Sequence, residues 1–303
     1  MIRDIAGRHN HTVKLARKLQ KKKHRRERGL IVGEGMDLLR AAVLAQAVVV
    51  DVLVRRELFD DLPVALRERA AAQQGGADVA GGLDIGLCDQ ELLDYASSLG
   101  GSADVIFICR RPVCHLSDLS LREGPVFYLD GVGDPGNVGT LCRSAVAFDL
   151  GGVVCSPATA DPYGPKALRA GMGAQFALPV VTDVTPEDLR VHLANAAPRF
   201  PDGALFAVAD PRSGVEAHRL AELLSEARPL VLVLGEERAG PRHEWPGAER
   251  VTIPQARFDS LNVAMAGTIL AYETWRARRP KRNDLAGNDG PSPIGLTPWK
   301  EES

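Results

Sequence analysis

Short apolar runs alternate along this chain with amphipathic stretches, and the alternation predicts strands that are each followed by a helix. In the first third the predicted strands are 30–32, 48–54, one that opens at Ile85, and 105–109. The predicted helices are 36–45, 63–72 and 90–95, and a partial helical spacing extends over 12–28. This order predicts a first α/β domain that ends near residue 112.

The same alternation continues beyond residue 124 and predicts a second α/β domain. Its predicted strands are 125–130, 152–155, 178–182, 204–209, 229–234 and 250–253. Its predicted helices are 138–148, 165–172, 185–194, 216–226 and 260–278. The strand 229–234, PLVLVL, is apolar throughout, which is typical of a strand buried on both faces of a parallel sheet.

A length of 303 residues fits two domains of ordinary size. We expect a first domain at 1–112, a linker at 113–123, a second domain at 124–279 and a tail at 280–303. The tail is rich in turn-forming residues and poor in apolar ones, and we expect it to be disordered because it offers little apolar surface to bury.

Several classes of protein are disfavoured by the composition. No apolar run reaches the roughly 18 residues of a membrane-spanning helix, and the N-terminus lacks the apolar segment of a signal peptide. The five cysteines form no C-x-x-C pair, and the seven histidines show no metal-binding spacing. We therefore expect a cytoplasmic protein with no membrane partner, no disulfide framework and no metal site.

The net charge of −2 conceals a strongly basic N-terminus, since residues 1–30 carry 11 Lys and Arg against two acidic residues. A basic arm on an acidic body is typical of a protein with a polyanionic partner. The run 12–28 is either a solvated charged helix or a phosphate-binding surface, and the near absence of acidic residues favours the second. No aromatic residues are interleaved there, so base stacking is not expected in this run.

The segment 131–136, GVGDPG, satisfies the G-x-G-x-x-G spacing of a dinucleotide-binding turn and lies between a predicted strand and a predicted helix. We expect Asn137 to be the N-cap of a helix that begins at Val138, which would leave Gly136 before the helix. No acidic residue follows the strand 152–155 to bind a ribose. A dinucleotide-dependent oxidoreductase is therefore disfavoured.

Three stretches at predicted strand ends carry glycines and polar residues, at the edge where α/β sheets bind ligands. They are DPGNVGTLCR at 134–143, LGEERAG at 234–240, and IPQARFDSLNVAMA at 253–266. In this order, and followed by Tyr272-Glu273, they resemble the three motifs of the SpoU/TrmH group of the SPOUT superfamily, RNA ribose 2′-O-methyltransferases. The resemblance covers residues 125–278 and includes KALRAGMGAQFALPV at 166–180, and the N-terminal part resembles the substrate (RNA)-binding domain that often precedes this fold.

The resemblance implies a small N-terminal α/β RNA-binding domain, and a C-terminal α/β SPOUT domain with a trefoil knot. It also implies S-adenosylmethionine as the cofactor, and a homodimer whose active site is assembled near the interface. The positions that it assigns to the cofactor are Leu234, Gly235, Gly240, Ile253 and Leu261. The third-motif loop is shorter than is usual in the family, with Gln255 and Arg257 where Met and Gly are common, which affects the placement of the adenosine.

By the same resemblance, Arg143 matches the catalytic arginine of a reaction in which a ribose 2′-hydroxyl attacks a sulfonium methyl group. An arginine is a poor base because its pKa exceeds about 12. Arg143 is therefore either a base whose pKa is strongly lowered or, more conservatively, a group that orients the ribose phosphate and stabilises the developing alkoxide. Asn137 and Glu237 would position Arg143 and the sugar, Ser260 and Asn262 would complete the pocket, and no metal is required.

RNA is the partner that the basic arm and the resemblance imply together, because phosphate neutralisation dominates RNA affinity. The expected contact residues are Lys14, Arg17, Lys18, Lys21, Lys22, Lys23, Arg25, Arg26 and Arg169. Large-subunit (23S) ribosomal RNA is the expected substrate. Transfer RNA is one alternative, and a non-catalytic RNA-binding ribosome-assembly factor is another, which the intact set of site residues disfavours. Some family members protect the ribosome from antibiotics made by their host, so a role in resistance also stays open.

Overall fold

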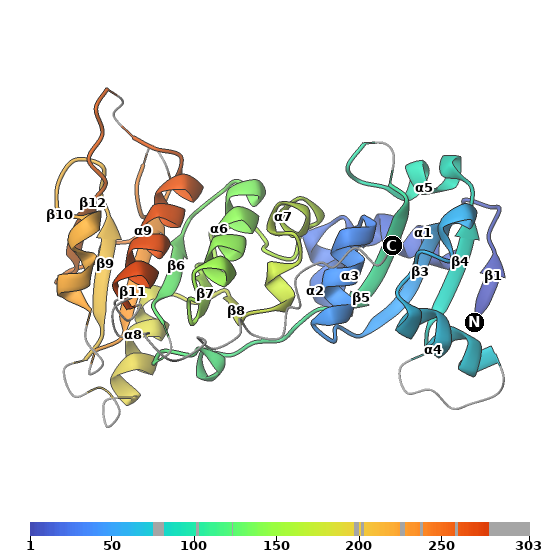
Figure 1. Ribbon diagram of the computed structural model, residues 1–303, viewed down its shortest axis with the longest axis horizontal. Helices are drawn as coiled ribbons and strands as arrows, with labels where there is room; N and C mark the ends of the chain where they lie inside the picture. The colour runs from blue at the N-terminus through green and yellow to red at the C-terminus, as the bar shows by residue number, and fades with distance from the viewer. Residues whose placement is uncertain are drawn as a thin grey trace, which may run out of the picture.

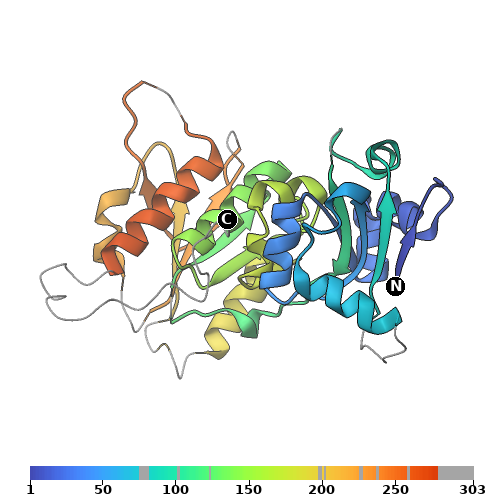
Figure 2. The ribbon, with the colours of Figure 1, turned by 45° about the vertical axis from the view of Figure 1, so that its right-hand side comes forward.

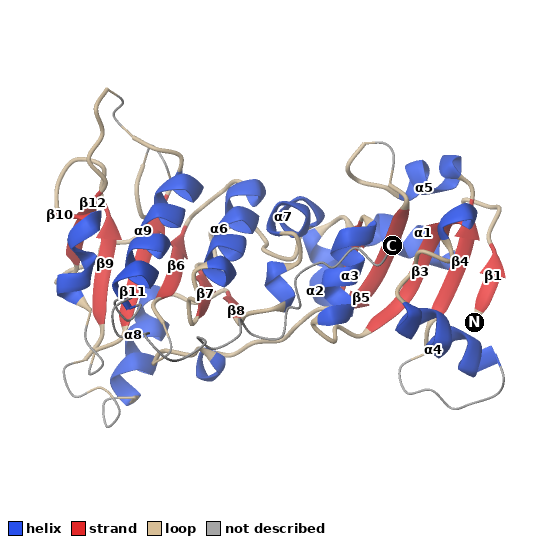
Figure 3. Cartoon of the chain, in the orientation of Figure 1, coloured by secondary structure: helices blue, strands red, loops and turns tan. Residues whose placement is uncertain are grey.

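The computed structural model describes residues 1–74, 82–100, 103–122, 124–196, 200, 203–224, 228–236, 239–257 and 260–278. These residues form two α/β units, each built on its own sheet and set side by side along the long axis of the molecule (Figure 1). Figure 3 shows the strands of both sheets with helices packed against them. The predicted boundaries at 112 and 124 stay predictions, and the predicted tail at 280–303 lies outside the described residues.

The N-terminal sheet has the strand order β1-β4-β3-β5-β2. Its strands are β1 (Ile2–Asp4), β2 (Leu30–Glu34), β3 (Val49–Arg55), β4 (Asp84–Cys88) and β5 (Val105–Arg110). The strand β5 runs antiparallel to both of its neighbours, whereas β1, β4 and β3 are parallel to one another. The sequence pattern did not predict β1, because three residues are too few to show alternation.

The helices of this unit are α1 (His11–Leu19), α2 (Lys22–Arg28), α3 (Met36–Leu44), α4 (Val64–Gln74) and α5 (Gln90–Ala96), with a 3₁₀ turn η1 (Arg56–Leu58). The basic run 12–28 forms two helices, because Lys21 between them has an extended backbone. Asn10 caps α1 by accepting hydrogen bonds from the N–H groups of Thr12 and Val13. Val13 and Leu19 are fully buried, so the lysines of α1 point outward.

The C-terminal sheet has the order β10-β12-β9-β11-β6-β7-β8, and all of its strand pairs are parallel. Its strands are β6 (Val126–Asp130), β7 (Gly152–Cys155), β8 (Val180–Thr182), β9 (Leu205–Ala209), β10 (Val215–Glu216), β11 (Leu230–Gly235) and β12 (Glu249–Thr252). Every residue of β6 and β11 is buried. For β11 the apolar run at 229–234 predicts this burial. The short strand β10 was not predicted.

The helices of the second unit are α6 (Pro135–Ala147), α7 (Pro165–Gly171), α8 (Pro186–Asn195) and α9 (Val263–Arg278), with 3₁₀ segments η2 (Leu116–Asp118), η3 (Ala174–Phe176) and η4 (Ala217–Leu223). The predicted α-helix at 216–226 was wrong, since its described part is the 3₁₀ segment η4. The helices α6 and α9 lie side by side on one face of the sheet (Figure 2). Gly267 permits this packing, because a Cβ there would lie 2.3 Å from Leu141 Cδ2 on α6.

The order in which strands are added to the sheet reverses at β6. The strands β7 and β8 lie on one side of it, and the later strands, beginning with its neighbour β11, lie on the other. In open parallel sheets ligands bind at the carboxyl ends of the strands beside such a point. The fold therefore places a candidate site where β6, β9, β11 and β12 end. The trefoil knot implied by the resemblance stays a prediction, and none of the helices in the described ranges is long and apolar enough to cross a membrane.

Candidate functional site

The first motif forms the start of α6, three residues earlier than the sequence predicted. Asp134, and not Asn137, is the N-cap: its Oδ1 accepts a hydrogen bond of 3.0 Å from the Asn137 N–H, and Pro135 occupies the first helical turn. Proline is favoured there because its missing N–H costs no helical hydrogen bond. Gly136 consequently lies inside the helix, and its predicted place before the helix was wrong. The argument against a dinucleotide-binding turn therefore loses the part that depended on the position of Gly136.

The Asp134 carboxylate also joins α6 to α7. Its Oδ2 accepts a hydrogen bond of 2.8 Å from Lys166 Nζ. This bond, followed by the one from the Asn137 N–H, lowers the pKa of Asp134 below the ordinary value of 3.8. The helix that carries Arg143 is thus anchored at its N-terminus by a carboxylate that is ionised at neutral pH.

The first and third motifs are joined by two asparagines. Asn262 donates from Nδ2 to Asn137 Oδ1 across 3.1 Å. Its own Oδ1 accepts from the N–H groups of Ala264 and Met265 at 2.9 and 3.3 Å, so Asn262 also caps α9. One side chain therefore fixes the start of α9 and its position relative to α6.

In the second motif, the chain at Gly240 and Pro241 passes closely over Gly235 at the end of β11. A Cβ on Gly235 would lie 2.0 Å from the Pro241 nitrogen, so only glycine fits beneath this crossing. Glu236 and Gly240 exchange two backbone hydrogen bonds of 3.0 and 2.8 Å, and Gly240 has a positive φ of 73°. The predicted catalytic residue Glu237 lies between them, outside the described residues.

A cavity of about 700 Å³ opens at the carboxyl ends of β9, β11 and β12. This volume lies within the range of small-molecule sites in proteins. All five predicted cofactor residues line it, together with Ser260: they are Leu234, Gly235, Gly240, Ile253 and Leu261. Glycine at two of these positions brings backbone N–H and C=O groups to the cavity wall, and such groups suit a ligand that is held through main-chain contacts. The residues fit a cofactor of nucleoside size, and their contact with S-adenosylmethionine stays a prediction.

One wall of the cavity is fixed by Asp130, a residue that the sequence analysis did not single out. Asp130 is fully buried at the end of β6. It accepts hydrogen bonds from the His243 N–H at 3.0 Å, from His243 Nδ1 at 2.7 Å and from Trp245 Nε1 at 3.1 Å. The Trp245 ring also packs edge-on against Tyr128, with ring centroids 4.9 Å apart. The signal for Asp130 was its acidic side chain at the end of an apolar strand.

A second lining residue that the sequence analysis missed is Asp210, which follows β9 at the same sheet edge. Its Oδ1 accepts a hydrogen bond of 2.8 Å from the Arg212 N–H, and its Oδ2 pairs with Arg250. Burial alone would raise the pKa of Asp210, but these bonds together lower it. Asp210 therefore brings an ion pair to the cavity wall, because Arg250 lines the same cavity. Its place directly after a predicted strand could have identified it.

Arg143 lies on the exposed side of α6, one turn from the exposed Thr140. The structure thus brings Asn137 and Asn262 together and places Ser260 at the cavity, while Arg143 projects from the same helix as Asn137.

Most of the predicted RNA-contacting residues are exposed. They are Lys14, Arg17, Lys18, Lys21, Lys23, Arg26 and Arg169, and Lys22 is half-buried. Arg17 donates to the Tyr95 carbonyl oxygen and stacks 4.1 Å from the centre of the Tyr95 ring. Arg26 is turned toward the second unit, where its Nη2 donates to both carboxylate oxygens of Asp183 at 2.7 and 2.6 Å.

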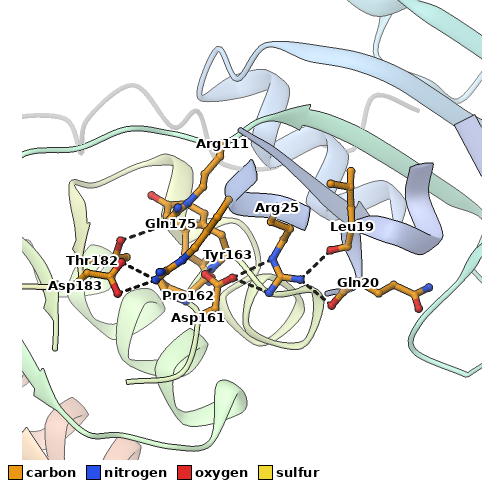
Figure 4. A network of polar contacts seen from close by, with 11 residues as sticks. Leu19, Gln20, Arg25, Arg111, Asp161, Pro162, Tyr163, Gln175, Thr182 and Asp183 are labelled. Atoms are coloured by element: carbon orange, nitrogen blue, oxygen red, sulfur yellow. Dashed lines mark hydrogen bonds and ion pairs between the residues drawn. The ribbon is translucent and has the colours of Figure 1, made fainter. Parts of the chain in front are cut away.

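Arg25 is a correction to the predicted RNA-contacting set. Its side chain is 4% exposed and is enclosed between the two units (Figure 4). Its guanidinium donates to Asp161 Oδ2 at 2.9 and 2.6 Å, and to the carbonyl oxygens of Leu19 and Gln20 at 2.8 Å each. A group with these partners, and with so little contact to solvent, is not available to bind a phosphate. The sequence could not show this, because Asp161 is distant along the chain.

Two family models match this chain. Residues 124–272 match the SpoU rRNA Methylase family, and residues 10–86 match the MRM3-like substrate binding domain. The second match falls on the unit that carries the basic helices α1 and α2, and the first on the unit that holds the cavity.

Known proteins resemble the chain over different shares of its length. The 23S rRNA (guanosine(2553)-2′-O)-methyltransferase RlmP of Bacillus subtilis is 27% identical over 286 residues, which cover 89% of this chain and 98% of that protein. The mitochondrial rRNA methyltransferase 3 of Mus musculus is 30% identical over 202 residues, 53% of this chain and 48% of its own, so the chain spans about half the length of that relative.

A solved structure is similar along almost the whole chain. The AdoMet-bound rRNA methyltransferase from Sinorhizobium meliloti superposes with a TM-score of 0.72 at 27% identity, and covers 92% of this chain and 99% of its own. Its name as an rRNA methyltransferase agrees with the match of residues 124–272. The chain therefore carries a SpoU methylase domain behind an MRM3-like substrate-binding domain, and the relatives that it resembles are named as rRNA methyltransferases.

Proposed function

We propose that this protein methylates a ribose 2′-hydroxyl of 23S ribosomal RNA, in the cytoplasm and as a homodimer. The observation that carries the proposal is the single cavity at which the second and third motifs meet, with Asn262 of the third motif bonded to Asn137 of the first. The Bacillus subtilis relative that spans nearly the whole chain is named as a 23S rRNA 2′-O-methyltransferase, which supports this choice of RNA.

S-adenosylmethionine, when bound, supplies an activated methyl group at its sulfonium. Backbone groups of Leu234, Gly235 and Ile253 would hold it along the cavity wall, where these residues lie. The ion pair of Asp210 and Arg250 lies on the same cavity and offers polar groups to such a cofactor. Asp130 keeps His243 and Trp245 in place on the cavity wall.

Arg143 is the residue that we assign to the ribose. Its planar guanidinium presents several N–H donors in a fixed geometry. It would orient the ribose phosphate and stabilise negative charge on the 2′-oxygen as the proton leaves. Asn137, fixed by Asn262, would hold the sugar beside it.

The homodimer accounts for an apolar stripe on α9. Met265, Ile269 and Tyr272 are 63%, 36% and 41% exposed and follow one another at intervals of four and three residues on one helix face. Large apolar side chains grouped on one surface usually mark an interface. The exposed Arg143 lies on α6, the helix that packs beside α9, so a second copy bound to this stripe would lie against the neighbouring helix.

The test is methyl transfer from radiolabelled S-adenosylmethionine into unmodified RNA. Large-subunit rRNA, small-subunit rRNA and transfer RNA are offered separately to the protein. We expect label in the large-subunit RNA at a rate at least tenfold above the other two, because specific RNA recognition rests on the shape around one nucleotide. Label chiefly in transfer RNA would contradict the assignment to 23S rRNA.

A further inference from the structure

The buried Arg25 occupies the centre of the contact between the two units (Figure 4). Its guanidinium joins helix α2 to two other parts of the chain: the carbonyl oxygens of Leu19 and Gln20 at the end of α1, and the Asp161 carboxylate of the second unit. Asp161 is itself fixed, because its Oδ1 accepts a hydrogen bond of 3.1 Å from the Tyr163 N–H. An arginine that matches a carboxylate through two N–H groups has little freedom of orientation.

Two further polar contacts flank this pair. Arg26, the next residue on α2, binds both carboxylate oxygens of Asp183. Arg111, which follows β5, donates from Nη2 to Thr182 Oγ1 at 3.0 Å, and its guanidinium lies 5.1 Å from the centre of the Tyr163 ring. These contacts attach the first unit to the second at Thr182 and Asp183 as well as at Asp161, and several attachment points oppose rotation of one unit about the other.

Apolar packing reinforces the contact. Gly173 has a positive φ of 82°, and a Cβ there would lie 2.8 Å from Ala41 Cβ on α3 of the first unit. One continuous cluster of buried apolar side chains includes Leu38 on α3 and Leu168 on α7. Units joined only by a small polar interface are expected to move relative to one another, and an apolar core across the contact opposes that motion.

The second-unit side of this contact leads directly to the catalytic helix. Asp161 lies just before α7, and α7 packs against α6 so closely that a Cβ on Gly139 would lie 2.2 Å from the Ala167 carbonyl oxygen. Lys166 of α7 also holds Asp134, the N-cap of α6. Rigid contacts therefore connect Arg25 through α7 to the helix that carries Asn137 and Arg143.

The first-unit side of the contact leads to the basic surface. Arg25 lies on α2 among the exposed Lys21, Lys23 and Arg28, and it holds the end of α1, which carries Lys14 and Lys18. We propose that Arg25 is a positioning residue: with Asp161 it sets the orientation of the basic face of α1 and α2 relative to α6, and so determines how bound RNA reaches Arg143, without itself touching RNA. This inference rests on the proposed function for its RNA substrate. The role of Arg25 in orienting the two units does not depend on that function.

The experiment compares Arg25→Gln with the matched control Arg28→Gln, which removes the same charge from an exposed position on the same helix. A second variant, Asp161→Asn, keeps the side-chain volume and leaves the cap on α1 intact, so it carries the test if circular dichroism shows that Arg25→Gln is unfolded. Each full-length protein is examined by small-angle X-ray scattering, by calorimetric titration with S-adenosylmethionine, and by steady-state methylation of the RNA that the unmodified protein accepts.

We expect Arg25→Gln and Asp161→Asn to change the scattering profile, and to lower kcat/KM for RNA roughly 10- to 100-fold, since small displacements of a reacting group have effects of that size. The cofactor Kd should stay within about twofold, because neither Arg25 nor Asp161 lines the cavity. The double variant should be no worse than the poorer single variant, since both remove one interaction.

The inference is overturned if Arg25→Gln matches Arg28→Gln in scattering and in kcat/KM, because Arg25 would then act only as one charge among many. It is also overturned if the effects of Arg25→Gln and Asp161→Asn add. If the unmodified protein methylates no RNA, the proposed function fails, while the scattering comparison still decides whether the pair fixes the orientation of the units.

Discussion

Asn262 and Asn137 are joined by a hydrogen bond of 3.1 Å between α9 and α6, although 125 residues separate them along the chain. The same Asn262 side chain caps α9, and its neighbours Ser260, Leu261 and Val263 line the cavity. The bond therefore lies at the edge of the proposed cofactor site and ties the residues that would hold the ribose to those that would hold the cofactor.

Substitution of Asn262 by Asp should separate these two roles. Aspartate is as good an N-cap as asparagine, so the midpoint of urea denaturation should hardly change. Aspartate has no N–H to donate to Asn137, so kcat for methyl transfer should fall, by roughly tenfold for the loss of about 1.4 kcal/mol in the transition state. The matched Asn262→Ala variant should lose the activity and also about 1 kcal/mol of stability. Full activity in Asn262→Asp would show that the bond between α6 and α9 is not needed.

Substitution of Asp130 by Asn should weaken cofactor binding. The carboxylate accepts three hydrogen bonds without contact to solvent, and an amide in its place can satisfy fewer of these donors. We expect about 1–3 kcal/mol of lost stability, together with a higher Kd for S-adenosylmethionine in calorimetric titration.

The control for Asp130 is Trp245→Phe, which keeps an aromatic ring against Tyr128 but removes one of the three donors. It should affect cofactor affinity less than Asp130→Asn does. An unchanged cofactor Kd in Asp130→Asn would mean that the wall formed by residues 241–248 is held by other contacts.

Much of the second unit could be predicted because its strands are short apolar runs and its helices have clear boundaries. The predicted strand 152–155 coincides with β7, and the predicted helix 165–172 differs from α7 by one residue. The start of α6 was misplaced because Asp134 and Asn137 are both good N-caps. The choice between them depends on Pro135, which fits the first helical turn.

The first unit shows what local pattern cannot supply. Alternation of strands and helices indicates an α/β unit, but it does not fix the direction in which β5 runs between β3 and β2. The division of the basic run into α1 and α2 depends on the extended backbone of Lys21, and the burial of Arg25 depends on Asp161, a partner 136 residues away.

Several residues that line the cavity could be predicted, because glycines and apolar residues at strand ends carry a local signal. Leu234, Gly235 and Ile253 lie together at the cavity. Asp130 and Asp210 were missed because a single acidic residue after a strand is common, and only the fold shows that the two strands end at the same edge. Glu237 stays a prediction.

The ion pair of Lys166 and Asp134 should give a characteristic pH dependence. The folded-state pKa of Asp134 is lowered from 3.8, so the pair stabilises the fold above that value, and its contribution is lost as the pH falls through the folded-state pKa. Urea denaturation of the unmodified protein and of Lys166→Met, from neutral pH to about pH 2, measures the difference. The two stabilities should differ at neutral pH and converge in acid, and a difference that is constant at every pH would contradict the assignment.

The exposed lysines of α1 and α2 should determine the salt dependence of RNA binding. Each phosphate contact contributes roughly 0.7 to 0.9 to the slope of log K against log salt concentration. The triple variant Lys14→Gln, Lys18→Gln, Lys21→Gln should therefore reduce the magnitude of this slope by roughly 2 to 3 in fluorescence anisotropy titrations. Arg219→Gln, which removes an exposed charge paired with Glu222 on η4, serves as the control and should leave the slope unchanged. If both variants changed the slope equally, the RNA would not bind at the lysines of α1 and α2.

The most direct test of the central claim is the chemical position of the transferred methyl group. Large-subunit rRNA labelled by the protein is hydrolysed with alkali, which needs a free 2′-hydroxyl at each cleaved nucleotide. We predict that the label appears in an alkali-resistant dinucleotide, and that Arg143→Ala loses it while keeping its affinity for S-adenosylmethionine. Label released in mononucleotides would establish methylation of a base and would contradict the 2′-O mechanism.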